Sequence, residues 1–361
     1  MNRRPFALDL DRSLGTAAGT IDRREGDIVR IGSAGVTGVG EATPLPGWTE
    51  SLDDCRAALD AVADADGTLL EAAAATPLEP LSTAPPVVTA PLDDTPAARH
   101  AVESAALDAL GRLEGRPLAS LLADAPAPSV PVNATLGDAS PEETVAAALD
   151  AVDAGFDCLK VKVGVGDLDR DVTRLRTVRA AVGSDVTLRA DANGAWDRET
   201  AEEAVEALSS LDLSYVEQPL PAADLSGHAG LRGRGVDIAL DESLTAATVA
   251  DVLAADAADV LVVKPMALGG PARAVGVARD TLGAGVDPVV TTTVDAAPAR
   301  TAAVHVAATI PDVRPCGLAT GDALETDLAP DPVPVEAGTV AVPDGPGVAG
   351  DAFDDLIGRG P

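Results

Sequence analysis

One short stretch decides the fold: FDCLKVKVG, residues 156–164. Its length and apolar content are typical of a short buried strand that ends at Gly164. Because side chains alternate along a strand, Lys160 and Lys162 point to one face and Val161 to the other. Two buried ammonium groups on one face are costly unless they are paired or partly neutral. Each should lower the pKa of the other, which suits a general base.

Lysine is otherwise almost absent from the chain. The 26 basic residues divide into 23 arginines and three lysines, the third being Lys264 at the end of the apolar run VLVV, residues 260–263. Arginine stays protonated in proteins, whereas lysine can lose its proton near neutral pH when its pKa is depressed. Retention of lysine at these three places indicates chemistry. The alternative is chance survival in strands or loops.

Carboxylates follow the neighbouring apolar runs. Asp191, Glu217 and Asp241 each stand where such a run ends. Positions 162, 191, 217, 241 and 264 are separated by 29, 26, 24 and 23 residues, each about one strand–loop–helix–loop unit. Each acidic residue alone is weak evidence in so acidic a chain, and simple solvation of loop starts is the alternative. Together with the lysines, the spacing favours a shared site.

The intervening segments have the pattern of helices. Ser140–Glu143 reads as a capping box with proline at the first helical position. Three apolar stripes at helical spacing are expected. The first is Val145, Leu149 and Val152, and the last is Ala201, Ala204, Val205 and Leu208. The middle stripe is Leu168, Val172, Leu175, Val178 and Val182, with Arg170, Arg174 and Arg176 on other faces. Strands and helices that alternate from about residue 130 to 320 predict an α/β fold, a (β/α) barrel of seven to eight units. Residues at the carboxyl ends of barrel strands line the active site, so lysines and carboxylates should converge.

The donor types predict a hard metal. Three carboxylates suit Mg²⁺, and Mn²⁺ accepts the same oxygen ligands. The histidines, His100, His228 and His305, do not follow strands, and we expect packing or surface roles for His100 and His305, which fall inside alanine-rich helical runs. A metal beside lysine bases suits removal of a proton next to a carboxylate, with the metal stabilising the resulting enediolate.

Composition limits the partners and the location. The formal charge of −32 disfavours binding to nucleic acid or to anionic membranes. With 46% hydrophobic residues, the charge indicates a surface adapted to high salt rather than disorder, and hence a halophile. No apolar run approaches the roughly 20 residues of a membrane span, and no signal-peptide core is seen. Three widely spaced cysteines fit a reducing cytoplasm. The oligomeric state is not fixed by the sequence.

The Lys160–Lys162 pair followed by Asp191, Glu217, Asp241 and Lys264 resembles the muconate-cycloisomerase-type branch of the enolase superfamily. Segments 14–21 and 38–49 resemble the two loops of the α+β capping domain of that family, and segments 101–110 and 338–347 resemble its linking helix and returning tail. The resemblance implies three parts: a capping domain at 1–128, a barrel at 129–325, and a C-terminal segment at 326–361 that returns to the capping domain.

Within that branch the chain is most similar to the o-succinylbenzoate synthases of menaquinone biosynthesis, through segments 23–26, 44–47, 291–295, 316–321 and 325–328. That family often has Ser within 291–293 and Gly at Arg300. The likeness implies dehydration of a small-molecule carboxylate, 2-succinyl-6-hydroxy-2,4-cyclohexadiene-1-carboxylate.

The implied roles follow the family motifs. Lys162 is the base, Lys264 stabilises the anion from the opposite face, and Lys160 depresses the pKa of Lys162. Asp191, Glu217 and Asp241 hold Mg²⁺. Asn193, which otherwise is a turn residue, supports the metal shell. The substrate contacts implied in this way are Asn193, Thr292, Thr293 and Leu318.

Alternatives stay open at this point. An N-acylamino acid racemase would use both faces, with Lys162 and Lys264 as the two bases. Dipeptide epimerases typically carry an Asp-x-Asp motif after the last barrel strand, where this chain reads GLATGD at residues 317–322. A muconate cycloisomerase is a further possibility. A non-catalytic barrel is disfavoured by the retention of all three lysines.

Overall fold

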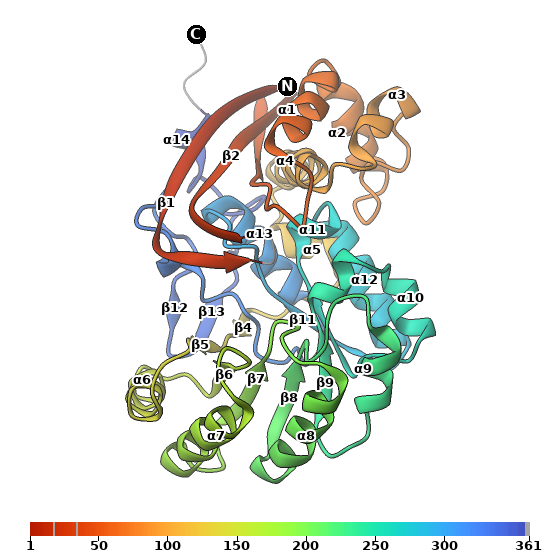
Figure 1. Cartoon of the computed structure of the whole chain (residues 1–361). Coiled ribbons are helices and arrows are strands. Elements are labelled where there is room, and N and C mark those ends of the chain that lie inside the picture. Colours follow the sequence, from red (N-terminus) through yellow and green to blue (C-terminus); the bar gives the residue numbers. More distant parts are fainter. Residues whose placement is uncertain (17–18, 34, 358–361) are drawn as a thin grey trace.

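The computed structural model describes residues 1–16, 19–33 and 35–357, and Figure 1 shows a capping domain over one end of a barrel. The capping strands are β1 (Asn2–Thr16), β2 (Gly19–Ser33) and β3 (Val36–Ala42), paired antiparallel in that order. The helices beside them are α1 (Leu52–Ala61), α2 (Asp66–Ala75), α3 (Pro86–Thr89), η1 (Ala90–Leu92), α4 (Pro96–Glu114) and α5 (Leu118–Leu122).

Helix α4 lies directly on β3. A side-chain carbon at Gly40 would collide with the carbonyl oxygen of Ala101, and one at Gly38 with that of Ala105. Glycine at these two places therefore permits the close approach of helix and strand. The apolar core continues from α4 through the capping helices into the last barrel helices.

The barrel strands are parallel, and their order in the sheet follows the sequence, as expected for repeated strand–helix units. They are β5 (Ala134–Leu136), β6 (Cys158–Lys162), β7 (Thr187–Asp191), β8 (Leu213–Glu217), β9 (Asp237–Leu240), β10 (Val260–Val263) and β11 (Asp287–Val290). Cys316 forms a parallel bridge with Val132 at one edge, and Gly317 forms one with Thr291 at the other. The predicted fold of barrel and capping domain is confirmed.

Helical segments follow the barrel strands along the chain. They are α6 (Pro141–Asp153), α7 (Leu168–Val182), α8 (Arg198–Leu208), η2 (Ser209–Leu211), α9 (Leu225–Leu231), η3 (Glu242–Thr245), α10 (Val249–Ala254), α11 (Pro265–Leu268), α12 (Pro271–Gly283), α13 (Ala297–Ala308) and η4 (Gly321–Ala323). The predicted capping box opens α6: the Glu143 N–H donates to Ser140 Oγ at 3.2 Å, and the Ser140 N–H donates to Glu143 Oε2 at 3.0 Å.

The stripe expected on α6 is confirmed at Val145 and Val152, which pack partly buried against the barrel core, but not at Leu149. Leu149 is 43% exposed, while Thr144 and Ala148 are the buried residues of this helix. Arg174 is fully buried and donates to the carbonyl oxygens of Lys162 and Gly137 at 3.0 and 2.9 Å. Its Nε also donates to the hydroxyl oxygen of Thr144. The contact favours a small residue on that face of α6.

The apolar stripes predicted on α7 and α8 agree more closely with the structure. Val172, Leu175 and Val178 are buried, as are the four residues expected on α8. The three histidines are buried packing residues: a ring nitrogen of His100, His228 and His305 lies 2.8, 2.9 and 2.7 Å from a backbone carbonyl oxygen. Of the two roles expected for His100 and His305, packing is therefore the one that is confirmed.

The C-terminal segment crosses both parts. Strand β13 (Thr339–Ala341) pairs with β12 (Val335–Glu336) on one side and with β4 (Ser129–Pro131) on the other, and α14 spans Asp354–Ile357. Beyond β13 the Leu118 N–H donates to the Gly347 carbonyl at 2.7 Å, which brings the tail to the capping helices. The domain boundaries at 128 and 325 stay predictions. Within the described residues, no helix is long and apolar enough to cross a membrane.

Two buried glutamates join the capping domain to the barrel; we call this region the seam, made of Glu41, Glu103 and the first turns of α13 and α12. Glu41 of β3 accepts N–H bonds from Ala296 and Ala299, each at 2.9 Å. Glu103 of α4 accepts from Ala272 at 2.7 Å. Helix N-termini favour such anions. Burial still raises the pKa of Glu103 to about 7, and burial with the nearby charge of Asp295 does the same for Glu41.

Candidate active site

The barrel brings the predicted site residues to one end, which we call the mouth: Lys160, Lys162, Lys264, Asp191, Glu217 and Asp241. Lys162, Asp191 and Glu217 lie in register on β6, β7 and β8, since Lys162 pairs with Asp191 and Asp191 with Glu217. Asp241 follows β9 and Lys264 follows β10. In the sheet order, strands β7 to β9 stand between the two lysine-bearing strands. The carboxylates are therefore flanked by lysine on both sides.

The lysine pair on β6 points inward, as the alternation predicts, while Val161 is fully buried on the other face. Lys160 Nζ lies 2.9 Å from Glu217 Oε1 and 3.0 Å from Asp191 Oδ2. Lys162 Nζ donates to Asp191 Oδ2 and to Asn193 Oδ1, both at 2.7 Å. The Lys162 side chain is 33% exposed and that of Lys160 15%, so Lys162 is the more accessible to a substrate.

Lys264 has a different environment. Its Nζ donates to Asp241 Oδ2 at 2.7 Å, and the Trp48 ring centroid lies 3.3 Å from the same nitrogen. The Lys264 side chain is only 10% exposed. Trp48 comes from the loop after β3, so the capping domain supplies one wall of this site. The resemblance of segment 38–49 indicated a capping loop here, but no local pattern indicated the contact of Trp48 with Lys264, because the two residues are far apart along the chain.

The expectation that the two lysines of β6 lower each other's pKa is wrong for Lys160. Burial lowers the pKa of Lys160, but the charges of Asp191 and Glu217 raise it well above the usual range. The carboxylates win because both lie within hydrogen-bond distance of the ammonium group. Lys160 is therefore a fixed cation in this structure rather than a base.

The carboxylates are electrostatically strained. Burial, the charge of Asp191 and to a lesser extent that of Asp241 raise the pKa of Glu217 to about 7. Burial raises the pKa of Asp241 to about 6, despite the opposing charge of Lys264. The pKa of Asp191 moves the other way: burial would raise it, but Lys160 and Lys162 hold it well below its usual value.

These carboxylates fit a divalent cation. Asp241 Oδ1 is buried and has no hydrogen-bond partner among the described residues, so one oxygen is free to act as a ligand. All donors are carboxylate oxygens, which Mg²⁺ prefers. Within residues 1–16, 19–33 and 35–357, no three acidic, histidine or cysteine side chains already stand in a metal-site arrangement. Here Lys160 Nζ contacts two of the three carboxylates.

Neighbouring amides position the mouth, and sequence reasoning found only one of them. Asn193 has a φ of 46°, as a turn residue can, and its side-chain N–H group donates to Glu242 Oε1 at 2.8 Å. Gln218, which we did not predict, is fully buried and accepts the N–H groups of Asp241 and Ser243 at 3.0 and 3.1 Å. Its place directly after Glu217 was the available signal.

The other expected substrate contacts are already engaged. Thr292 and Thr320 hydroxyl oxygens lie 3.0 Å apart, and the Thr293 hydroxyl donates to Asp295. Leu318 is 1% exposed and packs in the core. Substrate contact by these residues stays a prediction. Arg300, noted as a departure from the family, pairs with Asp327 and Asp331 and has a structural role.

Capping loops border the mouth. Arg24 of β2 is buried and donates to the carbonyl oxygens of Thr43, Pro44 and Val294, which ties the loop after β3 to the loop after β11. The segment expected to form the other capping loop spans 14–21, and its residues 17 and 18 lie outside the described residues.

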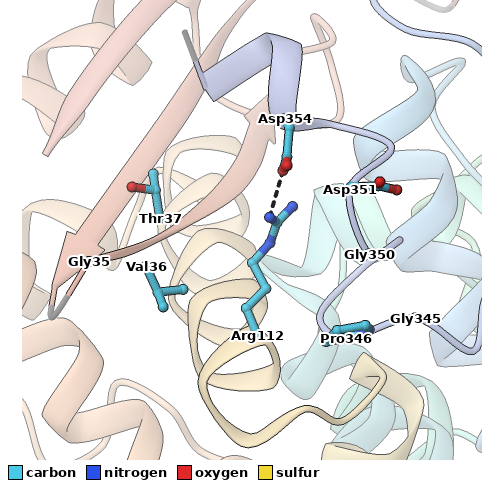
Figure 2. Close-up of a pocket in the computed structure, with 9 residues that line it drawn as sticks. All are labelled: Gly35, Val36, Thr37, Arg112, Gly345, Pro346, Gly350, Asp351 and Asp354. Carbon is cyan, nitrogen blue, oxygen red and sulfur yellow. Dashed lines mark hydrogen bonds and ion pairs between the residues drawn. The ribbon is translucent and has the colours of Figure 1, made fainter. Parts of the chain in front are cut away.

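A large cleft of about 760 Å³ lies elsewhere, where the C-terminal tail crosses the capping domain (Figure 2). It is lined by Gly35, Val36, Thr37, Arg112, Gly345, Pro346, Gly350, Asp351 and Asp354. Arg112 pairs with Asp354 across it at 2.7 Å. None of the mouth residues lines this cleft. We therefore place the candidate active site at the mouth.

Two known protein families match the two parts of the chain. Residues 143–352 match the family described as "Enolase C-terminal domain-like". Residues 7–123 match "Mandelate racemase / muconate lactonizing enzyme, N-terminal domain". The first match covers β6 to β11 and most of the tail, and the second covers most of the capping domain.

Several characterised relatives have different activities. The chain is 38% identical to an o-succinylbenzoate synthase of Thermobifida fusca over 216 residues, 58% of this chain and 66% of that one. It is 30% identical to an L-Ala-D/L-Glu epimerase of Bacillus subtilis over 349 residues, 95% and 93% of the two chains. Other relatives of similar identity are racemases and chloromuconate cycloisomerases.

A solved structure shows the same architecture. The dipeptide epimerase of Enterococcus faecalis V583, in complex with Mg and L-Leu-L-Tyr, superposes with a TM-score of 0.84 at 27% identity. The match covers 96% of this chain and 98% of that one. A divalent metal and a small ligand are thus compatible with this fold in a related protein.

Proposed function

The chain belongs to the mandelate racemase / muconate lactonizing enzyme family of enolase-like enzymes, and from this premise we propose that it is an o-succinylbenzoate synthase. Its reaction would be the syn-dehydration of 2-succinyl-6-hydroxy-2,4-cyclohexadiene-1-carboxylate to 2-succinylbenzoate, a step of menaquinone biosynthesis. The observation that carries proton-transfer chemistry is the convergence of three lysines and three carboxylates at the mouth. The likeness to the Thermobifida fusca synthase supports the finer assignment.

Lys162 is the proposed base. It is the most exposed of the three lysines, and Asn193 and Asp191 fix the direction of its Nζ. In the proposed reaction, Lys162 takes the proton α to the ring carboxylate and returns it to the departing hydroxyl group on the same face. One residue can perform both transfers because the two groups lie on one side of the ring in a syn elimination.

The other two lysines act as cations in this proposal. Lys160, whose pKa is raised by Asp191 and Glu217 against the effect of burial, contributes a fixed positive charge beside the substrate carboxylate. Lys264 approaches from the β10 side and faces the opposite side of the ring. Preorganised positive charge stabilises the negative charge that develops on the substrate.

Asp191, Glu217 and Asp241 are the proposed metal ligands, and Mg²⁺ bound there would supply Lewis-acid stabilisation of negative charge on the carboxylate. Burial raises the pKa of both Glu217 and Asp241, and the charge of Asp191 adds to the shift of Glu217, so a bound cation would relieve an unfavourable burial of charge. Mn²⁺ is an acceptable substitute on ligand chemistry.

A racemase of N-acylamino acids is the second candidate. The observation that favours it is the presence of lysine on both flanks of the carboxylates, together with relatives of that activity. A dipeptide epimerase is less well supported, because residues 317–322 lack the Asp-x-Asp motif expected after the last strand.

The test is a dehydration assay in molar KCl with Mg²⁺, using the cyclohexadiene carboxylate and Lys162→Ala as the control. Formation of o-succinylbenzoate by the wild type, and its loss in the variant, would establish the synthase and its base. Proton exchange at the α-carbon of N-succinyl amino acids without dehydration would instead identify a racemase. If the protein binds the metal but catalyses neither reaction, both assignments are refuted.

A further inference from the structure

The loop that carries Trp48 is firmly built. The N–H groups of Trp48 and Thr49 both donate to the Leu45 carbonyl at 3.0 Å, and the Leu45 N–H donates to the Thr49 hydroxyl oxygen at 2.9 Å. Gly47 has a φ of 87°, which glycine adopts without strain. At the base of the loop, Arg24 holds the carbonyl oxygens of Thr43 and Pro44. The indole position is therefore set by the loop rather than by chance.

This loop makes the two flanks of the mouth unequal. Lys264 Nζ is enclosed between the Trp48 ring at 3.3 Å and Asp241 Oδ2 at 2.7 Å. Lys162 has no ring contact among the described residues, one of its two partners is the neutral amide oxygen of Asn193, and it is three times as exposed. An ammonium group over an indole face is held by charge–quadrupole attraction.

We propose that Trp48 is a positioning residue that makes proton transfer one-sided. It covers Lys264 and holds its ammonium group away from the substrate α-carbon, so that only the Lys162 face exchanges protons. The inference rests on the proposed α-proton chemistry and deepens it. The same scaffold without the indole would have two working faces, so Trp48 separates a dehydratase from a racemase.

The step to be measured is the exchange of the substrate α-hydrogen for deuterium in D₂O. An uncharged lysine amine takes the α-hydrogen, the C–H bond breaks, an N–H bond forms, and the electron pair moves onto the substrate carboxylate. The lysine then returns a deuteron acquired from solvent. Because each enantiomer of an N-succinyl amino acid presents its α-hydrogen to one flank, exchange of each enantiomer reports on one lysine.

The experiment compares the wild type, Trp48→Leu and Trp48→Phe with both enantiomers of N-succinyl-phenylalanine, followed by NMR in molar KCl and Mg²⁺. We expect Trp48→Leu to raise exchange of the Lys264-side enantiomer by about tenfold or more, since a cation–π contact of this kind restrains the ammonium group by a comparable factor. Trp48→Phe keeps a ring and should stay close to the wild type. Adding Lys264→Ala to Trp48→Leu should abolish the gain.

The outcomes separate this inference from the proposed function. No gain in Trp48→Leu, or a wild type that already exchanges both enantiomers equally, overturns the role of Trp48. A wild type without dehydration activity overturns the synthase assignment, whereas a Lys264-dependent gain in Trp48→Leu still supports the role of Trp48. Circular dichroism of both variants identifies loss of fold, and a gain of exchange is itself a result that a misfolded protein would not give.

Discussion

Buried carboxylates occupy both the seam and the mouth, but their partners differ. At the seam, Glu41 and Glu103 accept backbone N–H groups of helix N-termini, which have fixed positions. At the mouth, the carboxylates contact lysine ammonium groups instead. A buried oxygen without a partner among the described residues occurs in both regions, Glu103 Oε2 at the seam and Asp241 Oδ1 at the mouth. The same residue type thus joins domains in one region and is available for binding and catalysis in the other.

The difference shows how buried charge can be assigned a role. Burial raises the pKa of Glu103 and Glu217 alike to about 7, so the shift alone does not separate structure from function. The partners do separate them. Neutral backbone donors indicate a structural role, whereas charged lysine partners that converge at the end of a barrel indicate a site for binding and catalysis.

The largest effect should come from Lys162→Ala at the mouth. Loss of the proposed base is expected to lower kcat by about 10³-fold, within the range typical of general bases. The thermal midpoint should change little, because Lys162 is one-third exposed and Asp191 keeps Lys160 as a partner. Steady-state kinetics measures the effect on kcat, and calorimetry measures the effect on the thermal midpoint. A large fall in the midpoint would mean that the mouth, like the seam, is built for stability.

The second-largest effect should come from removal of Mg²⁺. A ligand present at about 100 times its dissociation constant stabilises a protein by roughly 2.7 kcal/mol. Chelation with EDTA should therefore lower the free energy of unfolding by about that amount, because the mouth carboxylates lose a counter-charge. Chemical denaturation with and without EDTA measures this. An Asp241→Asn variant should respond less, and an equal response in that variant would contradict metal binding at the mouth.

At the seam, Glu103→Gln should change the pH dependence of stability. The pKa of Glu103 is raised by burial from 4.5 to about 7, so the folded state binds more protons and this contribution to stability falls as pH rises from about 4.5 to 7. Glutamine keeps an oxygen for the Ala272 N–H group and does not ionise. The variant should be more stable than the wild type at pH 7.5, on the order of 1–2 kcal/mol.

Urea denaturation between pH 5 and 7.5 tests this prediction. The difference between the two proteins should shrink toward pH 5, where Glu103 is protonated in the folded wild type. A constant difference across the range would show that Glu103 is not the titrating group. The Mg²⁺ response should be the same in both proteins, which keeps the seam distinct from the mouth.

The smallest effect is expected for Asn193→Gly. Glycine accepts the positive φ at this position and removes the oxygen that directs Lys162 Nζ. A hydrogen bond to a charged group is worth roughly 1.5–3 kcal/mol, so kcat should fall by about tenfold or somewhat more. Because Asp191 still contacts Lys162, the loss should stay well short of that in Lys162→Ala. Equal losses in the two variants would mean that Asn193 itself takes part in the chemistry.

Much of this fold could be predicted because local patterns repeat. The alternation of Lys160, Val161 and Lys162 gave the facing of β6, and the spacing of Asp191, Glu217 and Asp241 gave the barrel units and the end at which they meet. These features depend on periodicity and on parallel strands sharing one edge, both of which are visible in a sequence.

The rest depends on contacts that carry no local signal. Trp48 reaches Lys264 across two domains, and Arg174 is buried because carbonyl oxygens of other segments surround it. The prediction for the pKa of Lys160 was wrong for the same reason. Burial lowers this pKa, but the charges of Asp191 and of Glu217, which is 57 residues away, outweigh burial and raise it. Sequence spacing shows which end a residue occupies, not which atom it contacts.

The seam also bears on the order in which the chain is made. Glu41 emerges early in synthesis, yet its partners Ala296 and Ala299 are 255 and 258 residues further along. Ala272, the partner of Glu103, is synthesised 169 residues after it. Until then both carboxylates stay in water, and the capping domain has no finished surface against which to pack. The nascent protein therefore reaches its final form only after the last barrel helices have left the ribosome, which favours one late, cooperative closure over stepwise folding of separate halves.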